Sequence, residues 1–132
     1  MEINLVAILV AAVAAFFIGF LWYTFLFQKP WMKELGFKSE KEMNSNPNMG
    51  KLLLGSFVLE VLMAFGLSLL IEADTSVSAG AVTGSIAGLF ISGFALGNNY
   101  LFEGKTLTLW LINAGYVTVI FTAMGAILAL LA

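Results

Sequence analysis

The chain alternates between long apolar runs and short polar stretches. The runs cover residues 3–27, 52–71, 77–100 and 107–132, and only a few polar side chains interrupt each of them. A helix needs roughly 20 apolar residues to cross a hydrocarbon core of about 30 Å, and lipid cannot satisfy the backbone of an isolated strand. The pattern therefore predicts an all-α fold, an integral membrane four-transmembrane-helix bundle in which each run forms one spanning helix.

We expect a single transmembrane domain, residues 1–132, with helices at about 3–28, 51–72, 77–100 and 107–132. The stretch 29–50, "KPWMKELGFKSEKEMNSNPNMG", is the one extended polar segment of the sequence. Its lysines, glutamates and turn-forming residues predict a solvated polar linker between the first and second helices.

Composition supports a membrane protein and narrows its chemistry. The chain of 132 residues is 61% hydrophobic and 11% charged, whereas soluble domains carry roughly 25% charged residues. It contains no Cys and no His, so we expect no disulfide, no thiolate nucleophile, no metal site and no cofactor. A net charge of −2 and the lack of Arg argue against binding to nucleic acid.

The distribution of charge predicts an orientation in the membrane. Four of the six lysines lie in the linker, Lys51 directly follows it, and Lys105 lies in the connection between the third and fourth helices. Acidic residues without lysine mark the amino end and the second connection, at Glu2, Glu72 and Asp74. Because lysine-rich connections stay in the cytoplasm, we expect a cytoplasmic linker and two extracytoplasmic termini.

A single glutamate interrupts the second apolar run, in "SFVLEVLMAF" (residues 56–65). At a rise of about 1.5 Å per residue, Glu60 lies roughly 13 Å from Lys51 and thus near the middle of the membrane. An ionised carboxylate facing lipid there would cost about 2.5–3.5 kcal/mol or more. The apolar runs contain no Lys or Arg to pair with it. We expect Glu60 to face the bundle interior, to be protonated, or both.

Other polar side chains concentrate in the half of the bundle that includes the linker. They are Trp22 and Tyr23 on the first helix, Asn98 and Asn99 on the third, and Asn113 and Tyr116 on the fourth. One hypothesis is a polar cavity that opens to the cytoplasm and contains Glu60. The alternative is a neutral glutamic acid that bridges helices through hydrogen bonds of about 0.6 kcal/mol each.

The third run has a stripe of small residues at Gly80, Gly84 and Gly88. Glycines at a spacing of four residues let a neighbouring helix approach closely, which drives helix association in lipid. The stripe predicts either packing within the monomer or a homo-oligomer through the third helix.

Two segments resemble a known family. They are residues 19–32, with "GFLWY" followed by "LFQKPWM", and residues 109–129, "LWLINAGYVTVIFTAMGAILA". Both are similar to the DUF1761 family of small bacterial integral membrane proteins, although Gln28 and Val117 replace the Gly and His that are common in that family. The resemblance implies a multi-pass protein of the bacterial inner membrane. The family has no assigned activity, so the resemblance implies none.

Two classes of function remain open. The first is a small-ligand-binding, lipid-binding or transport-type bundle built around a buried carboxylate, and the second is a structural or interaction protein without ligand chemistry. We do not expect an enzyme, because the sequence offers no His, no Cys and no close carboxylate cluster. Membrane lipids are the expected partners.

Overall fold

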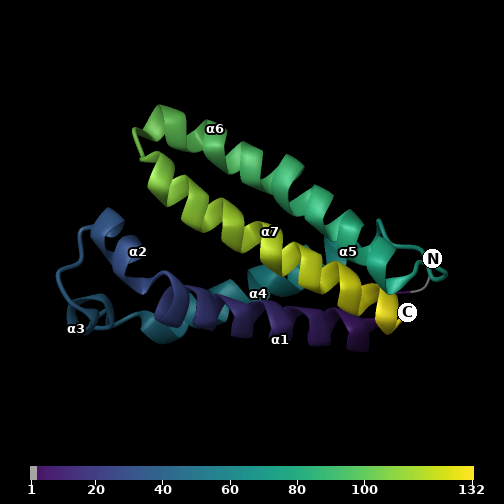
Figure 1. The fold of residues 1–132 in the computed structure, drawn as a ribbon. Coiled ribbons are helices and arrows are strands. Elements are labelled where there is room, and N and C mark those ends of the chain that lie inside the picture. Colours follow the sequence, from purple (N-terminus) through teal and green to yellow (C-terminus); the bar gives the residue numbers. More distant parts are fainter. Residues whose placement is uncertain (1–2) are drawn as a thin grey trace.

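The computed structural model describes residues 3–132, and Figure 1 shows a helical bundle with connecting turns. Over that range it forms four helices that are long and apolar enough to cross a membrane, so the predicted all-α architecture is confirmed. The first span joins α1 (Leu5–Leu21) to a π-helical turn, η1 (Trp22–Leu26), and the second is α4 (Met49–Ser68). The third joins α5 (Val77–Ile86), the π-helical η2 (Ala87–Gly93) and α6 (Phe94–Glu103), and the fourth is α7 (Leu107–Leu130).

The linker contains two short helices, α2 (Gln28–Leu35) and α3 (Glu40–Met43). Pro30 lies in the first turn of α2, where a residue without an N–H group is tolerated. Gly36 ends α2 in the left-handed conformation, with a φ of 81°.

Two helix boundaries differ from the predicted ones. The second span ends at Ser68 instead of near residue 72, and the Ser68 hydroxyl donates to the Phe65 carbonyl in the last turn. The third span continues past residue 100 to Glu103, because the residue that ends it is Gly104, with a φ of 72°. The apolar run therefore underestimates the length of the third helix.

The fourth span lies at the centre of the molecule. The third span packs along one side of α7 and α1 packs along another, while α4 packs on α1 and also contacts α7. Both termini and the α4–α5 connection lie at one end of the bundle, which we call the termini end; the linker and the α6–α7 connection lie at the other, the linker end (Figure 1). At the termini end, the Asn4 side-chain amide donates to the Leu131 carbonyl at 2.8 Å.

The glycine stripe of the third span faces α7. A side chain added at Gly84 would collide with the Phe121 carbonyl, and one at Gly80 would collide with the Gly125 carbonyl. A hydrogen bond of 2.7 Å between the hydroxyls of Ser85 and Thr122 joins the same two helices. The stripe therefore packs within the chain, and we call this contact the glycine seam.

Candidate functional site

Glu60 is 2% exposed, and among residues 3–132 it is the one charged side chain that is buried. It lies on α4, about 16 Å from the start of that helix and about 12 Å from its end at 1.5 Å per residue. The Tyr116 hydroxyl, on α7, donates to Oε1 of Glu60 at 2.8 Å. Oε2 is buried and has no hydrogen-bond partner among the described residues. The carboxyl group is thus only half satisfied.

Gly19 of α1 makes room for the Tyr116 ring. A Cβ atom at this position would lie 3.0 Å from the Tyr116 hydroxyl oxygen and 3.2 Å from Cε1. Hydropathy does not reveal this role, but the sequence does carry a signal for it. Small residues recur every fourth position along α1, at Ala7, Ala11, Ala15 and Gly19, and the three alanines are fully buried.

The π-helical turn η1 directs two adjacent aromatic side chains toward α7. The Trp22 indole donates to the Ile112 carbonyl at 3.0 Å, and the Tyr23 hydroxyl donates to Oδ1 of Asn113 at 2.6 Å. In a regular α-helix adjacent side chains diverge by about 100°, so the wider turn helps both to reach one neighbour. Asn113 in turn donates to the Tyr100 hydroxyl at 2.7 Å.

Three aromatic rings form a corner next to Glu60. The Tyr23 ring packs edge-on against that of Tyr116 with centroids 5.1 Å apart, and it lies 4.7 Å from the Trp31 ring at 51°. The hydroxyls of Tyr116 and Tyr23 are both engaged, by Glu60 and Asn113. Neither hydroxyl therefore has a proton left to donate to a ligand.

These groups line a partly open groove of about 450 Å³ at the linker end. Its other walls come from α1, η1, α3 with its C-cap residue, and the first half of α4. The apolar lining residues are Phe16, Gly19, Phe20, Met43, Met49 and Leu53, and the polar ones are Thr24, Asn44 and Ser56. Glu60 is the one charged residue among the described side chains that line it. We call this space the Glu60 groove.

The prediction of one polar cavity shared by all the candidate residues needs correction. Asn98 and Asn99 on α6 are exposed and do not line the Glu60 groove, because the third span packs chiefly on α7, away from α4. Trp22 packs its ring against Gly115 instead. Asn113 binds two tyrosines and not Glu60. Of the six proposed neighbours of Glu60, Tyr116 and Tyr23 line the groove with it.

The chain matches the sequence model of one protein family. The model of a family described as "Protein of unknown function (DUF1761)" matches residues 6–129, nearly the whole chain. The chain belongs to the DUF1761 family. No curated protein and no solved structure matches it.

The two segments that carried the resemblance to DUF1761 also build the groove. Residues 19–32 supply Gly19, Tyr23 and Trp31, and residues 109–129 supply Tyr116. The DUF1761 match extends across α4 as well and therefore includes Glu60.

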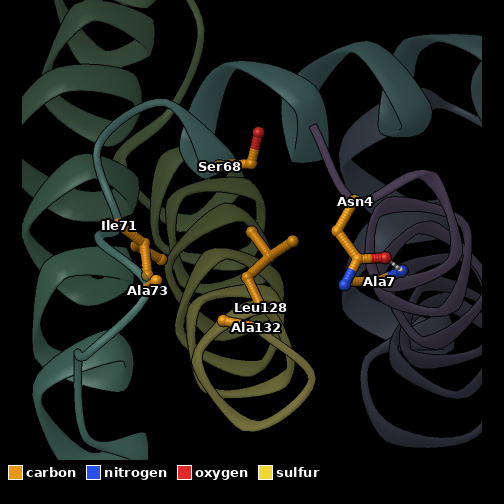
Figure 2. A pocket seen from close by; sticks show the side chains of 7 residues that line it. All are labelled: Asn4, Ala7, Ser68, Ile71, Ala73, Leu128 and Ala132. Carbon is orange, nitrogen blue, oxygen red and sulfur yellow. Dashed lines mark hydrogen bonds between the residues drawn. The ribbon is translucent and has the colours of Figure 1, made fainter. Parts of the chain in front are cut away.

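A second cavity of this DUF1761 protein lies at the termini end and is much smaller, about 140 Å³. Figure 2 shows its lining, which comes from the ends of α1, α4 and α7 and from the α4–α5 connection. Its polar side chains are satisfied locally. Asn4 accepts from the Ala7 amide and donates to the Leu131 carbonyl, and Ser68 donates to Phe65. This cavity offers a ligand little chemistry.

The DUF1761 chain holds no cluster of metal-binding side chains in the part that the structure describes. No three or more residues among Asp, Glu, His and Cys come together there. The chemistry of the site thus depends on one carboxyl group, its tyrosine partner and the surrounding aromatic rings.

Proposed function

We propose that this membrane protein binds one small amphipathic molecule, a lipid or another apolar ligand with a polar group, in the Glu60 groove. The observation that carries the proposal is the half-satisfied carboxyl group of Glu60, a residue that lines that groove. A buried polar atom without a partner costs about 1–3 kcal/mol. A ligand that supplies the missing partner for Oε2 would recover that free energy.

The dimensions and lining of the groove support the same proposal. Ligand pockets in proteins usually measure about 300–1,000 Å³ and combine apolar walls with a few polar groups. The Glu60 groove, at about 450 Å³, has aromatic and aliphatic walls and one charged residue. It contains neither His nor Cys and no second carboxylate, so the proposal is for binding and not for catalysis.

The position of the groove favours access from the membrane. Phe20 of α1 and Leu53 of α4 both line the groove, and they are 54% and 49% exposed. Their outer surfaces belong to spanning helices, where the surroundings are lipid. A ligand with an apolar chain can therefore reach Glu60 laterally, between α1 and α4. Release toward the opposite side of the membrane would make the protein a transporter.

We propose that the linker end faces the cytoplasm and that both termini are extracytoplasmic. The linker and the α6–α7 connection lie at the same end of the bundle (Figure 1). Together they carry five of the six lysines, and the sixth, Lys51, lies in the first turn of α4 next to the linker. Thr106 in that connection donates to Glu34 of α2 at 2.6 Å, which ties the two together. By the positive-inside rule, both lysine-bearing connections then face the cytoplasm together.

A structural or interaction role is the second candidate. The observation that favours it is the hydrogen bond from Tyr116 to Glu60, which joins α7 to α4 near the middle of the membrane. If the carboxyl group served only to join these helices, its second oxygen, Oε2, would remain buried without a hydrogen-bond partner. For that reason we rank a structural role below ligand binding.

Native mass spectrometry of the detergent-purified protein tests the binding proposal. The protein is equilibrated separately with three probes of equal chain length, decyltrimethylammonium, decanol and decyl sulfate. We expect retention of at least one probe and its loss in Ser56→Phe, which adds a ring to the groove wall. The matched control is Leu59→Phe, on a 61% exposed position of the same helix that lies outside the groove. If no probe is retained, or if both variants retain it like the wild type, the proposal is wrong.

A further inference from the structure

We infer, building on the proposed binding function, that the Glu60 groove is a site for an alkylammonium group, primary or quaternary, carried on an apolar chain. The inference rests on three properties of the groove: its charge, the arrangement of its rings and the hydrogen bonds that its polar groups have already made. The charge argues against anions, and the other two properties favour a cation over a neutral ligand.

The charge of the groove excludes anions. Glu60 lines it, and none of the other described lining residues is Lys, Arg or His. An anionic head group next to this carboxyl group would have no counter-charge, and in a medium of low dielectric constant such repulsion is large. A cation, in contrast, would provide the partner that the span itself lacks.

The aromatic corner selects among the remaining ligands. The rings of Tyr23, Trp31 and Tyr116 come from three different elements, and they meet at 51° and 61° with centroids about 5 Å apart. All three residues line the groove, and the face of an aromatic ring attracts a cation such as a quaternary ammonium group. Trp31 belongs to the linker helix α2, so the corner includes a residue outside the spanning helices.

The existing hydrogen bonds point to the same ligand. The Tyr116 hydroxyl is committed to Glu60 and the Tyr23 hydroxyl to Asn113. A neutral ligand that needs hydrogen-bond donors would have to break one of these bonds. A primary ammonium group can donate to Oε2 of Glu60, and a quaternary one needs only a counter-charge and aromatic surface; Glu60 and the three rings supply these.

Two sources could provide this chemistry, the head group of an aminolipid and a free hydrophobic amine. An aminolipid would already be bound when the protein is purified, and decyltrimethylammonium would displace it in native mass spectra. A free amine would leave no lipid adduct, and the decyltrimethylammonium would bind to a protein of unmodified mass. Both results agree with the inference and separate the sources.

The test compares the three decyl probes on the wild type and on Glu60→Gln, which preserves the shape of the side chain and removes its charge. We expect the wild type to bind decyltrimethylammonium at least tenfold more tightly than decanol or decyl sulfate. Glu60→Gln should abolish this preference and leave decanol binding unchanged. Equal binding of decanol and the cation by the wild type would overturn the inference and leave the proposed binding function intact. Retention of no probe would overturn both.

Trp31→Leu provides an independent measurement if Glu60→Gln does not fold. Trp31 is partly exposed and donates no side-chain hydrogen bond to the described residues, so its loss should be tolerated. A cation–π contact of this kind is worth roughly a threefold to tenfold change in affinity. Trp31→Leu should therefore weaken decyltrimethylammonium binding by about that factor, with little effect on decanol. An equal loss for both probes would mean that the ring provides only apolar contact.

Discussion

Glycines serve opposite purposes in the two halves of this bundle. In the glycine seam, Gly80 and Gly84 admit backbone atoms of α7, which brings two helices into direct contact. At the linker end, Gly19 admits the end of the Tyr116 side chain, which brings a hydroxyl group to Glu60. Backbone cannot move aside, whereas a ring can rotate. We therefore expect the seam to contribute most to stability and the Glu60 groove to contribute most to binding.

The seam should give the largest effect on stability. In Gly84→Leu the new side chain would collide with the Phe121 carbonyl and push α5 away from α7. We expect a loss of about 3 kcal/mol or more, at the upper end of the usual cost of overpacking. Thermal unfolding in detergent, followed by circular dichroism, measures the change.

The matched control for this substitution is Gly55→Leu in α4. Gly55 also lies within a spanning helix, but a Cβ atom there would meet nothing within 4 Å. This variant should unfold at the temperature of the wild type. Equal unfolding temperatures for Gly84→Leu and the wild type would contradict the role of the seam.

Glu60→Leu should separate stability from binding. The substitution removes the acceptor of the Tyr116 hydroxyl, but it also removes the buried Oε2 that has no partner. These effects oppose each other, so we expect a stability change below about 1 kcal/mol. Binding of decyltrimethylammonium should disappear. A loss of about 3 kcal/mol would instead support the structural role and erase the contrast with the seam.

The part of the fold that depends on composition could be predicted from the sequence. Four long apolar runs determine four spans, and a lone glutamate in one of them had to turn inward. The partner Tyr116 was among the predicted neighbours because it lies on a spanning helix at a similar depth. The pattern of apolar and polar residues does not show which helices are adjacent. It therefore groups Asn98 and Asn99 with Glu60, whereas the structure places them on α6, which packs on α7 and not on α4.

Two further features of the site depend on local geometry that hydropathy does not encode. The π-helical turn η1 changes the direction of Tyr23, and no residue type marks such a turn in the sequence. The contact of Gly19 with Tyr116 depends on the small-residue spacing along α1, which hydropathy does not encode.

Gly19→Ala should have a moderate effect that is confined to the groove. The added methyl group would lie 3.0 Å from the Tyr116 hydroxyl oxygen, so the ring must move by a few tenths of an ångström. Stability should change by less than about 1 kcal/mol, since Ala is also the better helix former. The hydrogen bond from Tyr116 to Glu60 should weaken, and the infrared carboxyl band of Glu60 should shift. The difference between the infrared spectra of the wild type and Glu60→Gln identifies this band. Gly115→Ala is the control, because its methyl group would meet Trp22 at 3.1 Å and not Tyr116; a similar band shift in both variants would contradict the specific role of Gly19.

The smallest effect is expected for Asn98→Ala and Asn99→Ala, which test the boundary of the site. Both amides are exposed, and neither makes a side-chain hydrogen bond within residues 3–132. Surface substitutions of this kind change stability by about 0.5 kcal/mol or less, and binding of the decyl probes should equal that of the wild type.

Asn113→Ala is the informative counterpart, because it leaves the hydroxyls of Tyr23 and Tyr100 without their partner, at a cost in stability of about 1–3 kcal/mol. If Asn98→Ala or Asn99→Ala reduced probe binding as much as Glu60→Gln does, the ligand site would have to extend across α7, and the division between the Glu60 groove and the outer face of the third span would be wrong.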